Sequence, residues 1–553
     1  MADAAELAAI TDASLIPGRG WTRRLEAVVF DGVTLVHYRR RLDRPDRPWI
    51  RMGAVSDAAT GPGELTWIGG RLHCRVLEAA GALTYRLTSD GWQPTSDRPW
   101  QPPPRQQLSL TAEVADAVGL LRAASVCERT WPQALVDEAG SIFGYQRRPD
   151  GRWQRSSCLR LADPQFADAT NSSVKLAQVT GDRDATVTPW GERLPTLSRS
   201  RATAGIRGTD LGVRFEHEGR SFLLFGDTHW TRPWLVLRDS IAEVFDDEPL
   251  PTVRFHGSPL QLRGGGATMG EYDVPLDAFS HQGELYGLFS SNHNQHRQTM
   301  GRSILARCVD PGLAPDPKRR HRPIRFQALA TLSDWHFINV SVQLRPAAEV
   351  PGCGREGEVL LLWGTGSYRA SEIRLAMLDA AGLARLSRLS GPVATAELGL
   401  RYWDGGGWSD DELAAAPLFR PGAFGELSVR WIPAAGRYAL LTATGPEDPA
   451  GNAITLRWAD QPAGPWTSRL RLLDWVAKGM SPDPFTRFIK ASHDDQVAEA
   501  IFPAQAKGNG AAYAPYLFDS RLEADELVLR YTLSTWNPYQ VVLLEHRLVP
   551  GEF

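Results

Sequence analysis

The sequence is poor in the features of disulfide scaffolds, structural zinc sites and membrane spans. Its five cysteines are odd in number, scattered over 553 residues and without a Cys-x-x-Cys pair. A disulfide framework and a structural zinc site are therefore not expected. No apolar run approaches the ~20 residues that a membrane-spanning helix needs. Charge of one sign is lacking too, since 61 basic residues stand against 64 acidic ones, and a nucleic-acid surface is not expected.

The first residues, MADAAELAAITDASL, also lack a basic segment followed by an apolar one. This start does not resemble a classical signal peptide. We expect a protein that either stays in the cytoplasm or is exported by a non-classical route, and the sequence leaves both open.

Glycine, proline and tryptophan, by contrast, are plentiful, at 51, 39 and 19 residues. The 42% hydrophobic and 23% charged residues are typical of a globular protein, and the length suggests two or three domains. Short runs rich in Val, Leu, Phe, Tyr and Trp alternate with turns of Gly, Pro, Asp and Asn, whereas long amphipathic windows are scarce. This pattern predicts an all-β protein with many short strands.

The second two-thirds of the chain contain five similar segments, which begin near residues 208, 272, 337, 425 and 513. Each has a polar residue, a strand, a turn and an apolar strand, and further strand-like runs follow. Units of ~60–90 residues with about four strands fit the blades of a β-propeller. We expect a five-bladed β-propeller over 172–553, with two packed sandwiches as the alternative. Because the last unit ends after three strands, VKLAQVTG at 174–181 is expected to close the ring.

The first of these units brings two acidic residues together. A two-residue turn at Glu218-Gly219 would place Asp210 opposite Asp227, where cross-strand Cβ atoms are about 4.5–5.5 Å apart. Facing carboxylates repel each other unless a cation, a shared proton or a catalytic task requires them. Asp210 and Asp227 are therefore the candidate catalytic residues, and solvated turn-forming aspartates are the alternative.

The starts of all five inner strands should lie at the same mouth of the channel. A turn at Gln282-Gly283 would likewise set Asp273 opposite Asn292. Carboxylates, amides and aromatic rings around one mouth suit a polyhydroxylated ligand, because amides bind hydroxyls and indoles cover the apolar face of a sugar. Most of the tryptophans should instead fill the core. The candidate substrate-binding residues are Asp273, Asn292, Asn339, Glu426, Trp230, Trp403, Tyr513 and Trp536.

Residues 1–170 contain a weaker repeat, at 26–40, 74–88 and 132–148, in which a hairpin is followed by Tyr and Arg. We expect a smaller, lectin-like β-repeat domain there that binds carbohydrate or docks the protein. In the alternative, its tryptophans only pin one repeat on the next. Residues 112–127 are expected to form a short helix.

Several motifs of the five units resemble a known family. They are GTDLG, FGDT, FINVSV, YRASEIRLA, FGELSVRW, YAPY and LSTWNPYQV. Over about 172–548 they resemble the domain-of-unknown-function family 4185, part of which is classed as glycoside hydrolase family 183, the endo-D-arabinanases. The resemblance implies a five-bladed propeller that cleaves furanoside linkages in D-arabinan. It places the catalytic aspartates on Asp210 and Asp227, and it puts Arg369 near the mouth to hold hydroxyls or a negative group.

The function expected from these observations is a glycosidase acting on a polysaccharide, most simply on arabinan or arabinogalactan. One aspartate would act as acid and the other as nucleophile or base, with Glu426 as a further candidate acid. We expect no metal and no cofactor. The expected partner is a polysaccharide or oligosaccharide substrate, with no nucleic acid and no membrane span, and the sequence leaves the oligomeric state open. The alternative is a non-catalytic carbohydrate-binding propeller, that is, a lectin or an adhesion or toxin-associated module, which would leave its ligand intact.

Overall fold

The structure is a computed structural model. It describes residues 12–17, 24–30, 34–41, 50–60, 63–68, 71–79, 81–89, 91–95, 108–111, 134–138, 141–147, 153–160, 173–187, 193–235, 238–247, 250–270, 272–293, 300–310, 313, 322–354, 356–366, 371–420, 422–445, 453–474, 501, 512–523, 526–536, 538–549 and 551–553.

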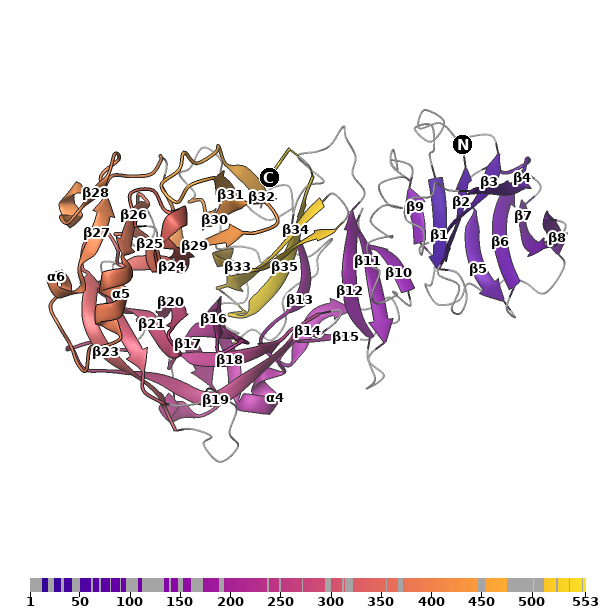
Figure 1. Cartoon of the computed structure of the whole chain (residues 1–553). Helices are drawn as coiled ribbons and strands as arrows, with labels where there is room; N and C mark the ends of the chain where they lie inside the picture. The colour runs from indigo at the N-terminus through magenta and orange to yellow at the C-terminus, as the bar shows by residue number, and fades with distance from the viewer. Residues whose placement is uncertain are drawn as a thin grey trace.

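Five radial sheets surround a channel, and they make the fold a five-bladed β-propeller, as predicted (Figure 1). The first strands of the blades contact one another in ring order, from β16 through β20, β24, β29 and β33 back to β16.

Within each blade the strands follow one another from the channel outward. Blade 1 consists of β16 (Ile206–His217), β17 (Arg220–Trp230), β18 (Ser240–Phe245) and β19 (Thr252–Arg263). Blade 2 consists of β20 (Pro275–His281), β21 (Glu284–Ser291), β22 (Arg302–Cys308) and β23 (Ile324–Ser333). Blade 3 consists of β24 (Asn339–Pro346), β25 (Glu358–Thr365), β26 (Arg374–Leu378), β27 (Leu400–Trp403) and β28 (Trp408–Ser409). Blade 4 consists of β29 (Phe424–Ile432), β30 (Arg437–Ala443), β31 (Ala453–Ala459) and β32 (Leu470–Asp474). Blade 5 consists of β33 (Ala512–Glu523), β34 (Glu526–Thr535), β35 (Val541–Leu548) and β13 (Val174–Gln178).

Short elements lie between the strands, some within a blade and some between blades. They are β14 (Arg183–Val187), β15 (Arg193–Pro195), α4 (Ser200–Ala204), η1 (Pro233–Leu235), η3 (Ala347–Glu349), α5 (Ala380–Leu386), α6 (Thr395–Leu398) and η4 (Glu412–Ala414). No helix among the described residues is long and apolar enough to cross a membrane.

The ring closes where the sequence predicts it. Strand β13 pairs antiparallel with β35, the last strand of the chain, so that blade 5 combines both ends of the propeller. The Lys175 side chain on β13 is fully buried, and its Nζ lies 2.6 Å from Oδ1 of the equally buried Asp184. The other oxygen of Asp184 accepts a hydrogen bond from the amide of Gln178 at 2.9 Å. Both carboxylate oxygens of Asp184 thus have a partner, and the buried ion pair supports the closing strand.

Two details differ from five separate four-stranded sheets. Blade 3 has a fifth, two-residue strand, β28. The outer strands of blades 1 and 2 pair with each other in parallel, from Leu260 opposite Ile324 to Arg263 opposite Gln327, and this joins the two blades into one eight-stranded sheet. The long β19 reaches past the end of its own blade and so offers its edge to β23, which removes two exposed strand edges.

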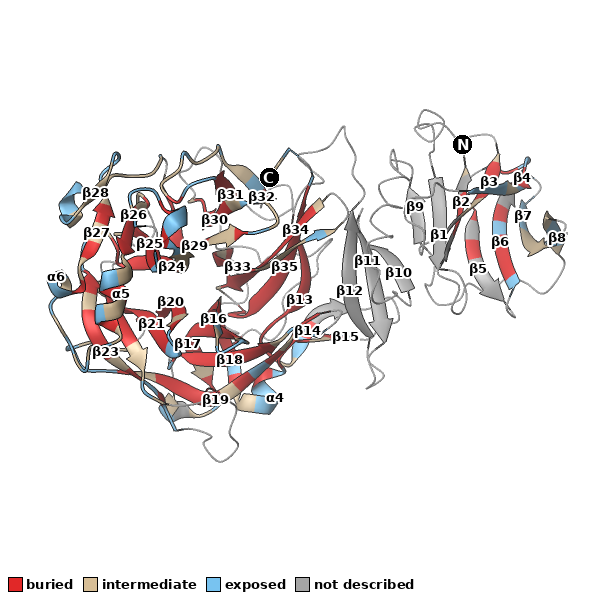
Figure 2. Cartoon of the chain, in the orientation of Figure 1, coloured by how far each residue is buried: buried red, intermediate tan, exposed pale blue. Residues whose placement is uncertain are grey.

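The core lies between neighbouring blades, because each middle strand is covered on both faces. Strand β25 shows this, with seven consecutive buried residues after Glu358, and Figure 2 shows the strands of the ring mostly buried. Between blades 3 and 4, the rings of Trp363 and Tyr438 pack 5.6 Å apart. Burial on both faces explains why the sequences of these strands are continuously apolar and do not alternate between apolar and polar residues.

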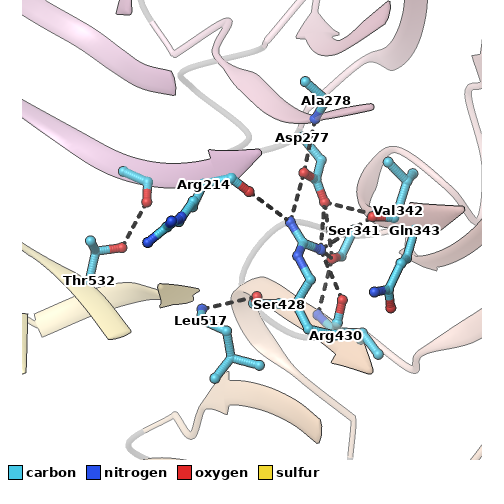
Figure 3. Close-up of polar contacts among 12 residues, drawn as sticks. Arg214, Asp277, Ala278, Ser341, Val342, Gln343, Ser428, Arg430, Leu517 and Thr532 are labelled. Carbon is cyan, nitrogen blue, oxygen red and sulfur yellow. Dashed lines mark hydrogen bonds and ion pairs between the residues drawn. The ribbon is translucent and has the colours of Figure 1, made fainter. Parts of the chain in front are cut away.

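A cluster of charged and hydroxyl side chains crosses the channel between the inner strands (Figure 3). Arg430 of blade 4 forms a two-pronged ion pair with Asp277 of blade 2, through Nη2–Oδ1 at 2.9 Å and Nη1–Oδ2 at 3.1 Å. The guanidinium also donates to the carbonyl of Val342 in blade 3 at 3.2 Å and to that of Arg214 in blade 1 at 3.3 Å. One side chain therefore links the inner strands of four blades. Beyond it, the channel opens into a cavity of about 510 Å³ at the far mouth.

The N-terminal third is also built from strands. They are β1 (Asp12–Pro17), β2 (Arg24–Phe30), β3 (Leu35–Arg41), β4 (Ile50–Ser56), β5 (Glu64–Ile68), β6 (Arg71–Glu78), β7 (Gly81–Thr88), β8 (Gly91–Thr95), β9 (Leu108–Thr111), β10 (Ala134–Glu138), β11 (Ser141–Arg147) and β12 (Trp153–Arg160). The three predicted repeats contain the hairpins β2–β3, β6–β7 and β10–β11.

The role of this region stays a prediction. The ring of Trp92 meets that of His37 edge to face at 5.3 Å, across two sheets, which favours the pinning role for this tryptophan. The helix predicted at 112–127 and the domain boundary predicted at 170–172 lie outside the described residues. A separate carbohydrate-binding domain over 1–170 therefore stays a prediction.

The contacts of Arg430 across the channel should contribute to the stability of the propeller. Arg430→Met would leave the Asp277 carboxylate, 1% exposed, without its charged partner. We expect the free energy of unfolding to fall by about 3–5 kcal/mol, as for other broken buried pairs. Chemical denaturation measures it. The matched control is Arg437→Met on the same blade, whose partner Asp460 is 74% exposed, and which should cost about 0–1 kcal/mol. Equal losses in both variants would contradict the central role of Arg430.

Candidate functional site

The first hairpin turns where the sequence predicts. Glu218 and Gly219 have φ values of 50° and 71°, the left-handed pair of a type I′ turn. His217 faces Arg220 directly across the turn.

The predicted pairing of the two aspartates is wrong by one residue. A bulge between Leu211 and Val213 adds a residue to β16, so that Asp210 faces Gly226 and not Asp227. The bulge turns the inner strand at the mouth, a position where such irregularities re-aim side chains. A Cβ atom at Gly226 would lie only 2.8 Å from Asp210 Oδ1, so this glycine leaves room for the carboxylate.

Both aspartates nevertheless line one small cavity of about 40 Å³ at the mouth of the channel. The cavity walls come from blades 1, 2, 4 and 5. They are Asp210, Leu211, Asp227, Tyr272, Val274, His293, Met300, Glu426, Tyr513, Trp536 and Tyr539. Asp210 is 6%, Asp227 4% and Glu426 2% exposed. Three carboxyl groups in a nearly dry space are costly unless they serve a task, and they mark a candidate active site.

Two tyrosine hydroxyls hold the carboxylate of Asp210. Tyr513 Oη and Tyr539 Oη donate to its Oδ2 at 2.8 and 3.0 Å. Burial, together with the nearby Asp210 carboxylate, raises the pKa of Tyr539 well above its ordinary value. The Tyr539 hydroxyl therefore keeps its proton and remains a donor. This arrangement favours the charged form of Asp210.

Asp227 is held by two main-chain contacts. The amide of Tyr272 donates to both of its carboxylate oxygens, at 3.0 and 3.1 Å. Its own amide donates to Oδ1 of Asp239 at 3.1 Å. Carboxylate and backbone of Asp227 are thus fixed separately.

Glu426 approaches from blade 4. It follows Gly425, which has a φ of 83°, at a shift in the register of β29 and β30. Its Oε2 atom is buried, and no hydrogen-bond partner for it occurs in the part of the chain that the structure describes. An oxygen of this kind is available to a ligand that enters the cavity.

Strained backbone concentrates at the same cavity. Four of its lining residues have positive φ although they are not glycine: Leu211 at 69°, Asp227 at 36°, Tyr272 at 70° and Tyr539 at 66°. Such conformations cost of order 1–3 kcal/mol each and persist where the surroundings impose them, often at functional sites.

Three polar residues predicted at the mouth contact the loops around it and do not line the cavity. Asp273 lies before β20, and a shift in register separates it from the predicted pairing with Asn292. Its carboxylate accepts hydrogen bonds from Thr268 Oγ1 at 2.6 Å and from the His293 amide at 2.9 Å. Asn292 is exposed, and the buried Asn339 donates through Nδ2 to the Gly425 carbonyl at 3.1 Å, next to Glu426.

The predicted tryptophans divide between site and core. Trp536 lines the cavity, and its ring meets Tyr539 edge to face at 5.8 Å. Trp230 is buried, with Nε1 donating to the Arg238 carbonyl at 3.0 Å. Trp403 lies on β27 at the outer part of blade 3 and packs on Trp408 at 5.4 Å, away from the cavity. Arg369 lies outside the described residues, and its placement stays a prediction.

Sequence reasoning gave four residues of this region no role in a carbohydrate site. The rings of Tyr272 and His293 lie 4.9 Å apart on the blade 2 side, with their planes tilted by 37°, and neither residue belongs to one of the family motifs. Tyr539 does belong to one, LSTWNPYQV, but nothing in the motif gives it a role. Asp239 is a single aspartate before β18, and only the fold brings it beside Asp227.

Asp239 is a further buried acid beside the cavity. It is 1% exposed, and burial, followed by the negative charges of Asp227, Asp210 and Asp273, raises its pKa well above the ordinary value. Within the described ranges, no group of three or more His, Cys, Asp or Glu residues is arranged to hold a metal ion.

The raised pKa predicts a pH-dependent stability. An acid whose pKa is higher in the folded state contributes stability at low pH, which is lost as the pH rises through the folded pKa. Asp239→Asn cannot ionise, so it should gain stability relative to the wild type as the pH rises from 4 to 8, measured by urea unfolding.

The control is Asp404→Asn. The amides of Gly406 and Gly407 lower the pKa of this exposed aspartate, so its contribution to stability is lost only at acidic pH. Its variant should therefore be less stable than the wild type by a nearly constant amount between pH 5 and 8. A difference between wild type and Asp239→Asn that does not change with pH would contradict the prediction.

Comparison with known proteins gives a family and distant structural likenesses. No curated protein sequence matches the chain. A structure titled "Glycoside hydrolase" has a TM-score of 0.36 at 9% identity, covering 70% of this chain and 98% of its own. An endo-arabinase from Bacteroides thetaiotaomicron has a TM-score of 0.33 at 14% identity, covering 64% and 99%. An α-L-arabinofuranosidase from Lactobacillus brevis has a TM-score of 0.33 at 10% identity, covering 63% and 93%.

At these scores the likenesses contribute nothing to the assignment of the site, which depends on its geometry. The family match is direct: residues 274–545 match the family described as "Domain of unknown function (DUF4185)". That range runs from the start of blade 2 into the last strand of blade 5. These residues, just under half of the chain, are therefore similar to the DUF4185 family.

Proposed function

We propose that the propeller is a glycoside hydrolase and that the cavity at its mouth is the active site. The observation that carries the proposal is the presence of three buried carboxyl groups, Asp210, Asp227 and Glu426, in one cavity that opens at the mouth. Glycoside hydrolysis needs a pair of carboxyl groups, one that gives a proton to the leaving oxygen and one that attacks the sugar or activates water.

The contacts suggest how the roles divide. Asp210 accepts two hydroxyl hydrogen bonds, which stabilise its charged form, so it suits the nucleophile or base. Asp227 and Glu426 are the candidates for the acid. Glu426 comes from blade 4 and keeps an oxygen available to the leaving group, whereas Asp227 is held beside Asp210 on the neighbouring strand.

For the substrate we propose D-arabinan, cleaved within the chain at D-arabinofuranosyl linkages. The motifs GTDLG and FGDT support this, because their resemblance to the endo-D-arabinanases implies that Asp210 and Asp227 correspond to the catalytic aspartates of those enzymes. Tyr513 and Trp536, both partly exposed at the cavity, offer aromatic faces for a sugar ring.

The test is incubation of the protein with D-arabinan, L-arabinan and arabinogalactan, followed by chromatography of the released sugars. D-arabinan should yield oligosaccharides of several lengths, as internal cleavage produces, and L-arabinan should stay intact. Release of monosaccharide alone would contradict internal cleavage. Binding of D-arabinan without any release would support the alternative, a carbohydrate-binding propeller.

Substitution of the two aspartates tests their catalytic role. Asp210→Asn and Asp227→Asn keep the size of the side chain and remove its charge, so each should lower kcat by about 10²–10⁴-fold or more with little change in substrate binding. The control is Asp246→Asn in blade 1, whose side chain is 61% exposed and pairs with Arg214; it should keep wild-type kcat. Wild-type activity in either of the first two variants would remove that residue from the mechanism.

A further inference from the structure

A fourth carboxyl group lies behind the cavity and does not reach it. Asp239 immediately precedes β18, the third strand of blade 1, and is 1% exposed. It does not line the cavity. Its Oδ1 atom accepts the amide proton of Asp227 at 3.1 Å, and for its Oδ2 atom the described residues provide no hydrogen-bond partner.

The contact with Asp227 fixes a strained residue. Asp227 has a φ of 36°, which a residue with a side chain adopts at a cost. Its amide is buried, and an unsatisfied buried donor costs about 1–3 kcal/mol. The Asp239 oxygen satisfies this donor and so favours the backbone conformation that aims the Asp227 carboxylate into the cavity. The Tyr272 amide holds that carboxylate from the other side.

Three other acidic residues lie near Asp239. Asp227 lies on β17, Asp210 on β16 and Asp273 before β20, and all three disfavour a further negative charge. A neutral carboxyl group can still accept the Asp227 amide through its carbonyl oxygen. In its neutral form Asp239 therefore holds Asp227 without adding to the charge of the cluster.

We infer that Asp239 is a positioning residue of the active site, which in its neutral form holds the Asp227 main chain in its left-handed conformation. The inference rests on the proposed function and extends it to a residue that touches no substrate. It has a consequence for the pH profile. When Asp239 ionises at high pH, its carboxylate adds a negative charge directly behind Asp227. We expect kcat to fall as this charge appears.

Two substitutions separate the hydrogen bond from the charge. Asp239→Asn keeps an oxygen for the Asp227 amide and cannot ionise. Its kcat near neutral pH should stay within a few-fold of wild type, and the decline of kcat at alkaline pH should move to higher pH. Asp239→Ala removes the oxygen. It should lower kcat by about 10–100-fold, as a displaced catalytic group does, while KM stays nearly unchanged.

The matched control is Ser240→Ala, one residue further along. It removes the hydrogen bond between Ser240 Oγ and Thr228 Oγ1, 2.7 Å long, but leaves the Asp227 amide bonded. This variant should lose stability and keep wild-type kcat, KM and pH profile, so a general loss of packing in blade 1 is distinguished from a loss of positioning.

Hydrogen exchange of the Asp227 amide tests the inference without any activity. Exchange should be slow in wild type and in Asp239→Asn, and at least about tenfold faster in Asp239→Ala, because that variant removes the oxygen that accepts the hydrogen bond of the Asp227 amide. If no polysaccharide is cleaved by the wild type, the proposed function fails, but the exchange rates still decide whether Asp239 fixes the Asp227 backbone.

Three results would overturn the inference. The first is unchanged exchange at Asp227 in Asp239→Ala. The second is a kcat of Asp239→Asn near neutral pH as low as that of Asp239→Ala. Such a result would mean that Asp239 is needed in its charged form, because asparagine keeps the accepting oxygen and lacks only the charge. The third, decisive even if Asp239→Ala does not fold, is an alkaline decline of kcat in Asp239→Asn at the same pH as in wild type.

Discussion

The Arg430 guanidinium is the point at which four blades of the propeller meet. Among the described strands, the inner strand of one blade is never paired with the inner strand of another, so side-chain contacts set their separation. Arg430 does this from blade 4 by bonding Asp277 in blade 2, the Val342 carbonyl in blade 3 and the Arg214 carbonyl in blade 1. The hydroxyl contacts in Figure 3 continue the ring, with Thr532 Oγ1 of blade 5 donating to a carbonyl of blade 1 at 2.8 Å.

The Arg430 contacts also divide the channel into two ends, which are lined by different side chains. On one side lies the cavity of Asp210, Asp227 and Glu426. On the other lies a wider cavity at the hairpin ends. Because the inner strands are held between these ends, their first residues can depart from regular β geometry. The bulge at Leu211 and the left-handed Asp227 are such departures. The Ser534 hydroxyl accepts a hydrogen bond from the Leu211 amide, and the buried Asp239 accepts one from the Asp227 amide.

Much of this architecture was predictable because the signals are local and repeated. Strand and turn patterns recur five times, the Glu218-Gly219 turn forms where its residues favour it, and the strand at 174–181 completes the unit that lacks one. The pairing of Asp210 with Asp227 was not predictable from the turn. A register counted from the turn holds only until a bulge, and the Leu211 bulge depends on how blade 1 meets blade 5, where the amide of Leu211 donates to Ser534 Oγ at 2.7 Å.

The sequence by itself therefore determined the all-β class, the number of blades, the closing strand and the mouth at which Asp210 and Asp227 lie. It could do so because periodicity and turn chemistry act between neighbours in the chain. Only the tertiary structure decided which polar residues share the cavity. Trp403 and Asp273 resemble site residues in sequence, yet one packs in an outer strand and the other binds its own loops. Asp239 and Tyr539 join the site through contacts between separate strands, because the folding of blades around a channel, and not spacing along the chain, brings them there.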